Sequence, residues 1–362
     1  MANKERIGVM TSGGDCAGLN AAIRAVVLAG EQKGYEVVGI KYATRGVIEE
    51  EQMYEVLTTK NLDRYLMKRG GTFLRSINKS KKYKEPLPDG RDAEGIKKVH
   101  DGFARLGIKK LISIGGDGSF AIMKKILEGS DIQFVTIPKT IDNDVAITEK
   151  CIGFDSAIAT TTKAADDLQA TAESHSRVMI LEAMGRDSGN LALHAGVATG
   201  ADVILIPEIP YNIDSIVKKL DHIHNEEGRD HAVIVVSEAI KDISGATIER
   251  EYAGGQKRYG GTGDYVARQI ADKTDYEIRH AVLGHAPRGC APNANDRILA
   301  SAFGAYAVEL IDQGKSGCAV CLVGDEVISK PIDEVVNSPY PGVDLDGTLV
   351  KTARALGICL GD

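Results

Sequence analysis

The sequence contains no Trp and only six Phe among 362 residues, so aromatic side chains make up just 5% of it. Proteins that bind single-stranded nucleic acid by base stacking need exposed aromatic rings, and this chain has few to offer. Basic residues are also in the minority, because 44 Lys and Arg stand against 51 Asp and Glu and give a net charge of −7. Such a chain repels nucleic acid and anionic membrane surfaces as a whole. We therefore expect neither as a partner, and local basic residues must hold any polyanionic ligand.

Long apolar runs and a metal-binding cysteine pattern are missing as well. No run approaches the roughly 18 apolar residues of a membrane helix, and the first ten residues, MANKERIGVM, begin polar. We expect no membrane span and no signal peptide. Only Cys318 and Cys321 among six cysteines form a CxxC pair, with no second pair or His pair to complete a zinc site. This pattern favours a cytoplasmic protein with reduced, buried thiols.

Short runs rich in Val and Ile alternate with amphipathic stretches along the whole chain. The clearest expected strands are residues 7–12, 36–41, 110–115, 134–138, 178–183, 203–207, 232–237 and 281–284. Their apolar runs are nearly continuous, which is typical of parallel strands covered on both faces. The alternation predicts an α/β fold, and the number of strands predicts two doubly wound lobes with mainly parallel sheets.

One segment is polar, basic and rich in proline. Residues 78–91 read NKSKKYKEPLPDGR. Such a composition predicts an exposed loop. Two interpretations remain open from the residues alone: a solvated surface loop, or a mobile basic lid over phosphate groups.

Glycine is abundant, with 40 residues, and three glycine or carboxylate clusters follow expected strands. The first, residues 11–20, reads TSGGDCAGLN. A strand, a tight glycine turn and a helix N-terminus together make an anion site from backbone N–H groups. The cluster matches neither the Walker pattern GxxxxGK[ST] nor GxGxxG. Turns of this kind also take glycine for packing alone, so both interpretations stand.

The second cluster, GGDGS at residues 115–119, again lies between a strand and a helix. It offers backbone N–H groups and adds a carboxylate, Asp117, suited to hold Mg²⁺ through water. The alternative is that Asp117 only caps the helix.

The third cluster, PKTIDND at residues 138–144, ends the next expected strand. Functional groups in open α/β sheets gather at the carboxyl ends of strands. Two aspartates flanking an asparagine repel one another unless a cation or a proton-transfer role offsets the repulsion. One carboxylate could deprotonate a hydroxyl while the other supports a metal. The alternative is an Asx-rich turn.

Six motifs stand in the order TSGGDxxGLNAAIR, RGGTFL, GGDGS, TIDND, MGR and LGHxxRG over nearly the whole chain. In these motifs the sequence resembles the 6-phosphofructokinases of the bacterial-type superfamily, which use either ATP or pyrophosphate. The resemblance implies a phosphofructokinase-like fold of two lobes. The lobe for the phosphate donor, ATP with Mg²⁺, would comprise residues 1–152 plus 290–338. The sugar-phosphate lobe would comprise residues 153–289 plus 339–362.

The resemblance also implies the reaction, which moves the γ-phosphoryl group of ATP to the C1 hydroxyl of fructose 6-phosphate in glycolysis. Asp142 is similar to the general base that takes the C1 hydroxyl proton. Thr140 resembles the residue that contacts the transferred phosphoryl group. Arg186 resembles the arginine that stabilises that group, and all three would touch the substrate.

The remaining site residues follow from the same resemblance. Mg²⁺ would be bound by Asp117, with Asp144 in support. The residues similar to the donor cradle are Gly14, Gly116, Gly118, Ser119 and Lys139. The residues similar to the sugar-phosphate ligands are Met184, Gly185, Glu238, His285, Arg288, Arg177 and Arg279. In the family the last two arginines come from the neighbouring subunit, which implies a homodimer or homotetramer with shared active sites.

The donor is indicated by two residues that point in different directions. In this family a glycine at the position of Gly118 leaves room for the α-phosphate of ATP, whereas Lys139 is usual in pyrophosphate-dependent members. Room is required for ATP, but a lysine can serve either donor, so ATP is the expectation. A reversible pyrophosphate-dependent enzyme is the alternative.

Two other classes of protein fit less well. A dinucleotide oxidoreductase would need GxGxxG and an acidic residue about 20 positions beyond it, and both are missing. A non-catalytic sugar-phosphate sensor would usually have lost its base or metal residue, yet Asp117, Asp142 and Asp144 are all present.

Overall fold

The computed structural model describes residues 4–77, 90, 92–245, 248–252, 256–340 and 342–362. The chain forms two compact units. Unit 1 comprises residues 1–156 and 288–340, and unit 2 comprises residues 157–287 and 341–362. The predicted basic loop at residues 78–91 lies outside the described residues, apart from Gly90.

Unit 1 is built on a seven-stranded sheet of order β13-β12-β5-β4-β1-β2-β3. The five strands from β12 to β2 run parallel, while β13 and β3 pair antiparallel at the two edges. The strands are β1 (Arg6–Thr11), β2 (Glu36–Ile40), β3 (Tyr54–Leu57), β4 (Ile108–Gly115), β5 (Gln133–Pro138), β12 (Cys318–Val323) and β13 (Glu326–Pro331). The strand order reverses between β1 and β4, and ligands of open α/β sheets bind at such a switch point.

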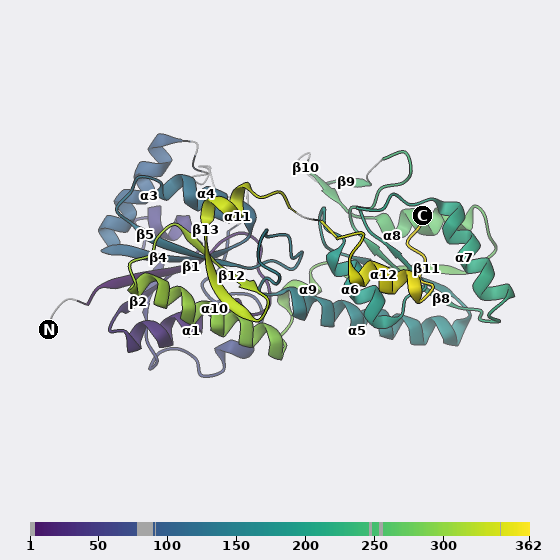
Figure 1. Ribbon diagram of the computed structural model, residues 1–362, viewed down its shortest axis with the longest axis horizontal. Coiled ribbons are helices and arrows are strands. Elements are labelled where there is room, and N and C mark those ends of the chain that lie inside the picture. Colours follow the sequence, from purple (N-terminus) through teal and green to yellow (C-terminus); the bar gives the residue numbers. More distant parts are fainter. Residues whose placement is uncertain (1–3, 78–89, 91, 246–247, 253–255, 341) are drawn as a thin grey trace. The chain divides into compact units, whose positions relative to one another are not determined.

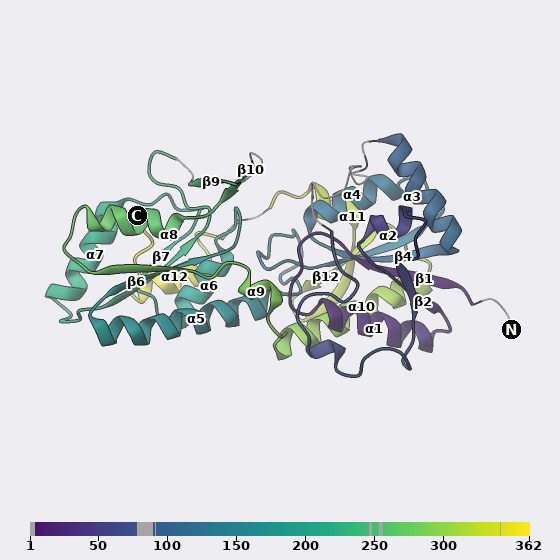
Figure 2. The same ribbon diagram turned by 180° about the vertical axis from the view of Figure 1, so that it is seen from behind.

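Helices cover both faces of this sheet, as Figure 1 shows and Figure 2 confirms from behind. The helices α1 (Leu19–Gln32) and α10 (Ala294–Asp312) lie on one face. The other face carries α3 (Ala93–Leu106), α4 (Asp117–Leu127) and α11 (Ile332–Asn337). The short helices of unit 1 are α2 (Thr44–Ile48) and the 3₁₀ turn η1 (Leu66–Lys68).

The sequence fixes helix α3 locally at both ends. Asp92 stands at its N-cap, and its carboxylate accepts hydrogen bonds from two N–H groups of the first turn at 3.2 and 2.8 Å. Gly107 ends the helix with φ of +65°, a left-handed conformation that glycine adopts without strain. The helix buries Val99 and Phe103 against the sheet.

Unit 2 is built on a four-stranded, fully parallel sheet of order β11-β6-β8-β7. These strands are β6 (Val178–Ala183), β7 (Val203–Leu205), β8 (Ala232–Ser237) and β11 (Ile278–Val282). A separate antiparallel hairpin comprises β9 (Glu249–Tyr252) and β10 (Gln256–Tyr259). The helices are α5 (Phe154–His175), α6 (Asn190–Thr199), α7 (Ile213–Asn225), α8 (Thr262–Ala271), α9 (Ala286–Gly289) and α12 (Thr348–Ala355). Both α5 and α9 cross a boundary between the units.

Alternate residues of β8 pack into two separate cores of unit 2. Val233 and Val235 belong to a cluster with residues of α5, α6 and α12. Ile234 and Val236 belong to a second cluster with residues of α7 and α8. Both views place α5, α6 and α12 on one side of this sheet and α7 and α8 on the other (Figures 1 and 2). Burial on both faces explains the continuous apolar run of β8 in the sequence.

The predicted α/β class with two mainly parallel sheets is confirmed. Seven of the expected strands correspond to β1, β2 and β4 to β8, whereas the strand expected at 281–284 begins earlier, as β11 at Ile278. The shift arises because β11 is an edge strand whose Arg279 and His280 are exposed, so its apolar signal is weak. Within the described residues, no helix is both long and apolar enough to cross a membrane.

Candidate active site

The three clusters predicted from the sequence follow three adjacent strands of unit 1. In the sheet register Thr11 of β1 lies beside Ile114 of β4, and Gly115 of β4 lies beside Pro138 of β5. Backbone hydrogen bonds of 2.9 Å continue the pairing past the strand ends, from Ser12 N to Ile114 O and from Lys139 N to Gly115 O. The three loops therefore start side by side at the carboxyl edge of the sheet.

The first loop leads from β1 into helix α1 through two glycines in left-handed conformations, Gly13 with φ of +80° and Gly18 with φ of +94°. Gly18 is the N-cap of α1, and no described side chain caps it there. The first turn of the helix carries no acidic residue. Its N-terminal N–H groups and the positive end of the helix dipole are consequently suited to an anion.

Arg288 packs against this first loop, although the sequence analysis grouped it with the sugar-phosphate ligands. Its Nη1 donates a hydrogen bond of 3.1 Å to the carbonyl oxygen of Asp15. A Cβ atom on Gly14 would overlap the guanidinium group. The guanidinium is the end of a flexible side chain that can shift, so this contact alone does not require glycine at position 14. The roles of both residues in ligand binding remain predictions.

The second loop connects β4 to α4. The helix begins at Asp117, with Gly116 as its N-cap, so Asp117 lies inside the first turn and is exposed to solvent. Gly118 is also exposed, and a Cβ atom there would meet no described atom within 4 Å. Neither backbone conformation nor packing requires glycine at this position. Ser119 joins the first two loops, because its Oγ lies 3.3 Å from Oγ of Ser12.

Lys139 places a buried cation beneath these loops. The residue is 4% exposed, and its Nζ would lie 3.3 Å from a Cβ atom on Gly13. Burial lowers the pKa of the Lys139 ammonium from its usual value of 10.5. The positive charge of Arg288 also lowers it, while the carboxylates of Asp142 and Asp144 oppose the shift. An anionic group beside it, such as a phosphate, would favour the charged form.

The third loop holds Asp142, Asn143 and Asp144. Asn143 adopts a left-handed φ of +50°, its Nδ2 donates to Glu149 O at 2.9 Å, and its Oδ1 accepts from Cys151 N at 2.9 Å. These two hydrogen bonds tie Asn143 to residues six and eight positions further along the chain and so fix the loop. The two hydrogen bonds of Asn143 fix the backbone that carries the carboxylates of Asp142 and Asp144. Asp142 is buried, with 3% of its surface exposed.

Asp142 is also connected to Thr140, whose Oγ1 accepts a hydrogen bond of 3.0 Å from Asp142 N. The base and phosphoryl-contact residues predicted from the sequence are therefore neighbours in one turn. Within the described residues, no group of three His, Cys, Asp or Glu side chains is arranged to hold a metal ion.

In unit 2 a second set of predicted residues lies at the carboxyl ends of β6 and β8. Gly185 and Arg186 follow β6, and Arg186 adopts a left-handed φ of +48°. Glu238 follows β8, and its Oε1 accepts hydrogen bonds from Gly185 N at 3.2 Å and Arg186 N at 2.9 Å. The next residue, Asp187, accepts a hydrogen bond of 2.8 Å from the Tyr259 hydroxyl. The loop that carries Arg186 is therefore held from two directions.

His285 is exposed just beyond the carboxyl end of β11, and Met184 is half-buried next to Gly185. Arg177 and Arg279 lie at the opposite, amino-terminal ends of β6 and β11. β6 contains six residues, so its two ends are about 17 Å apart. Within one chain, unit 2 does not bring these two arginines together with Arg186.

Sequence reasoning missed Glu277, which pairs with both of these arginines, and Tyr259. The pairing of Glu277 could have been predicted, because Glu277 and Arg279 are two residues apart on a strand and therefore share a face. The hydrogen bond of Tyr259 to Asp187 could not be predicted from a sequence pattern, because the two residues are 72 positions apart.

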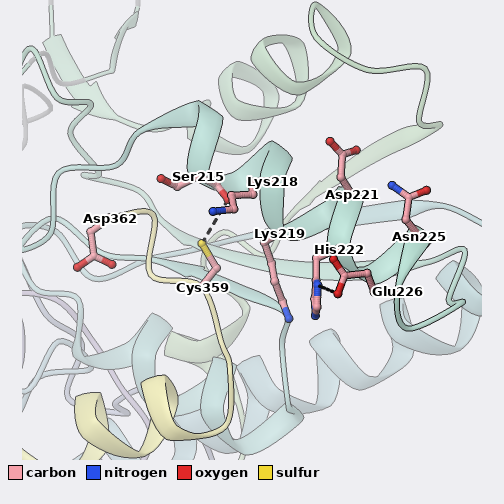
Figure 3. A pocket seen from close by; sticks show the side chains of 9 residues that line it. All are labelled: Ser215, Lys218, Lys219, Asp221, His222, Asn225, Glu226, Cys359 and Asp362. Carbon is pink, nitrogen blue, oxygen red and sulfur yellow. Dashed lines mark hydrogen bonds and ion pairs between the residues drawn. The ribbon is translucent and has the colours of Figure 1, made fainter.

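A hollow of about 500 Å³ also lies in unit 2, between α7 and the C-terminal segment (Figure 3). It contains none of the predicted site residues. Two of its basic groups lie beside carboxylates, since His222 lies 3.1 Å from Glu226 and Lys219 lies 3.3 Å from Glu227.

Residues 6–311 match the family described as phosphofructokinase. The chain belongs to the phosphofructokinase family. It is 48% identical to ATP-dependent 6-phosphofructokinase 1 of Synechocystis sp. and 47% identical to ATP-dependent 6-phosphofructokinase 1 of Nostoc sp., and each alignment covers 100% of both chains. The solved phosphofructokinase of Saccharomyces cerevisiae is 26% identical with a TM-score of 0.78, over 98% of this chain and 47% of the yeast chain.

Membership of the phosphofructokinase family confirms the resemblance predicted from the six motifs. All three loops of unit 1 and the Arg186 loop of unit 2 lie inside the matched residues. The family match thus covers the geometry described above, and the role of each single residue remains to be tested.

Proposed function

We propose that this protein is an ATP-dependent 6-phosphofructokinase, which transfers the γ-phosphoryl group of ATP to the C1 hydroxyl of fructose 6-phosphate and yields fructose 1,6-bisphosphate and ADP. The observation that carries the proposal is the full-length similarity, at 48% and 47% identity, to two proteins of that name. The three loops at the carboxyl edge of the unit 1 sheet support it, because they combine an anion cradle, carboxylates and a buried cation.

Unit 1 would bind the phosphate donor and unit 2 the sugar phosphate. In unit 1 the cradle would comprise Gly14, Gly116, Gly118 and Ser119, with Lys139 beneath it. In unit 2 the sugar ligands are the MGR loop, Glu238 and His285. Arg288 lies in unit 1, yet we keep it among the 6-phosphate ligands that the motif LGHxxRG implies.

Mg²⁺ fits the carboxylates of unit 1. Asp117 is exposed at the start of α4, and Asp144 is partly exposed on the adjacent loop. Two carboxylates would be few for a dedicated metal cage, but Mg²⁺ is usually held by one or two carboxylates together with waters and substrate phosphates. Bound there, it would neutralise charge on the donor phosphates. These two residues would therefore meet a metal that arrives with its nucleotide.

Phosphoryl transfer would then depend on positioning and charge. The transition state spreads negative charge over the equatorial oxygens of the transferred group, so cationic ligands stabilise it. Arg186 would supply that charge, and Thr140 Oγ1 would orient the group. Asp142 would accept the proton of the C1 hydroxyl as the new O–P bond forms.

Pyrophosphate is the second candidate donor, and Lys139 is the observation that favours it. A buried ammonium beneath the cradle can bind the phosphates of either donor. ATP additionally requires space for its α-phosphate, and the exposed, uncrowded Gly118 provides it. We therefore assign ATP as the donor.

The position of Arg177 and Arg279 supports a homo-oligomer. They lie at the end of the unit 2 sheet opposite Arg186, so they can complete a sugar-phosphate site only for another subunit. We propose a homodimer or homotetramer whose isolated subunit is nearly inactive. We further propose a cytoplasmic location, where ATP is present and the six free thiols stay reduced.

The test is a direct assay of the purified protein with fructose 6-phosphate, ATP and Mg²⁺, with the product identified by ³¹P NMR. We expect stoichiometric fructose 1,6-bisphosphate and ADP. Tight binding of fructose 6-phosphate without any bisphosphate would instead identify a sugar-phosphate sensor.

A further inference from the structure

Three charged side chains form one cluster at the amino-terminal ends of β6 and β11. Nε and Nη2 of Arg177 each lie 2.8 Å from Oε1 of Glu277. Nη2 of Arg279 lies 2.7 Å from the same oxygen. A single carboxylate oxygen therefore accepts hydrogen bonds from both guanidinium groups.

The backbone fixes this arrangement. β6 and β11 pair in parallel with Val178 beside Ile278, and Val178 N donates to Glu277 O at 3.0 Å. Arg177 and Glu277 each precede one of these paired residues, so they are neighbours across the two strands. Arg279 lies two residues beyond Glu277 in extended chain, which turns both side chains to the same face.

The cluster is open to solvent. The side chains of Arg177, Glu277 and Arg279 are 27%, 45% and 55% exposed. The carboxylate is thus not required to neutralise a buried charge. A soluble anion can reach the same N–H groups that Glu277 now occupies.

We propose that Glu277 is an internal competitor for the phosphate group of the sugar substrate, and so determines the affinity of this site. This inference rests on the proposed function, in which Arg177 and Arg279 bind that phosphate. The carboxylate holds the two guanidinium groups together in the free protein. Phosphate binding displaces it, because phosphate oxygens need the same donors in the same bidentate geometry.

Charge decides the direction of the effect. The cluster carries a net charge of one positive unit with Glu277 and would carry two with a neutral residue. A phosphate dianion binds more weakly when a carboxylate remains a few ångströms away, since like charges repel. The groups are partly solvated, so the repulsion is moderate, and its removal is expected to tighten binding about 3- to 10-fold.

The experiment compares the wild type with Glu277→Gln, whose amide oxygen still accepts from both arginines. We expect the KM for fructose 6-phosphate to fall about 3- to 10-fold, with kcat within about twofold, and the difference to shrink at high salt. Glu326→Gln, which removes one negative charge from β13 of unit 1, is the matched control and should leave KM unchanged. A KM that is unchanged or raised in Glu277→Gln would overturn the inference and assign Glu277 a structural role only.

A double-mutant cycle tests whether the effect passes through the arginines. In the Arg279→Gln background, Glu277→Gln should give much less improvement than in the wild type. An equal improvement in both backgrounds would contradict competition for Arg279. If Glu277→Gln does not fold, Glu277→Asp serves instead, since the shorter side chain withdraws from the arginines and should also lower KM.

Direct binding separates this inference from the proposed function. The dissociation constant of fructose 6-phosphate is measured by calorimetry without a phosphate donor, for the wild type and Glu277→Gln. Absence of turnover in both proteins would refute the kinase assignment. Tighter binding by the variant would still support competition by Glu277, and equal or weaker binding would refute it.

Discussion

The carboxylate of Glu238 accepts a hydrogen bond of 2.9 Å from the backbone N–H of Arg186. Arg186 has a left-handed backbone, a conformation that costs a non-glycine residue free energy and persists only where its surroundings impose it. Glu238, which we expect to bind sugar hydroxyls, thus also shapes the loop from which the Arg186 side chain extends.

Replacing Glu238 tests this dual role. Glu238→Ala removes the acceptor and lets Arg186 move, so we expect kcat to fall by about 100-fold, the loss that a displacement of about 1 Å can cause. Glu238→Gln keeps an acceptor oxygen for the loop and should retain much more of kcat while raising the KM for fructose 6-phosphate. The measurement is the steady-state kinetics of both variants. Equal kcat values for Glu238→Ala and Glu238→Gln would contradict a role of Glu238 in positioning Arg186.

Asp142 is expected to be the general base. Asp142→Asn preserves size and removes the proton acceptor, so kcat should fall by roughly 10² to 10⁴ while the binding of fructose 6-phosphate is retained. Asp131→Asn, an exposed change in the same unit, should leave kcat unaltered. A near-normal kcat in Asp142→Asn would show that another group takes the proton.

Gly118 is expected to set the choice of donor. A Cβ atom there meets no described atom within 4 Å, so Gly118→Asp should fold with little change in the thermal midpoint. Its carboxylate would occupy the space of the α-phosphate and repel the nucleotide, which should raise the KM for ATP at least about tenfold. Gly118→Ala is the control: its KM for ATP shows the effect of losing glycine without the charge and larger size of aspartate. An unchanged KM for ATP in Gly118→Asp would rule out this steric account.

Lys139 is expected to trade stability for donor binding. Its pKa is lowered on folding, so the folded protein binds fewer protons at this residue than the unfolded chain. The free-energy cost of burying the charged ammonium is present in full below the pKa that Lys139 has in the folded protein. This cost disappears as pH rises toward 10.5, the usual pKa of lysine. Lys139→Met should therefore be more stable than the wild type near neutral pH, although the KM for the donor rises.

The pH dependence provides the check for Lys139. The difference in the free energy of unfolding between Lys139→Met and the wild type should narrow as pH approaches 10.5, measured by denaturant titration at several pH values. Lys139→Arg keeps the charge and should not gain stability. A difference that widens with pH would contradict a lowered pKa.

The sequence predicted the strands that are buried on both faces better than those at the edges. Residues 233–236 of β8 are all apolar, and their side chains pack alternately into the two cores of unit 2. A continuous apolar run of this kind is easily recognised in a sequence. The edge strands β3 and β13 are only partly buried and escaped prediction. The apolar strand β12 was also missed, although its first four residues are buried.

The candidate site was predictable where its residues lie in short motifs that directly follow strands. GGDGS and TIDND lie on adjacent loops because β4 and β5 are adjacent in the sheet. The position of Arg288 against the first loop was not predictable, because its contact with Asp15 spans 273 residues. Only the folded chain reveals a contact of that range.

The most direct test of the account compares ATP with pyrophosphate as the donor for fructose 1,6-bisphosphate formation, at saturating Mg²⁺ and fructose 6-phosphate. We expect kcat/KM for ATP to exceed that for pyrophosphate by at least about 100-fold. Efficient turnover with pyrophosphate and little with ATP would contradict the assignment. It would show that the buried Lys139 outweighs the open space at Gly118.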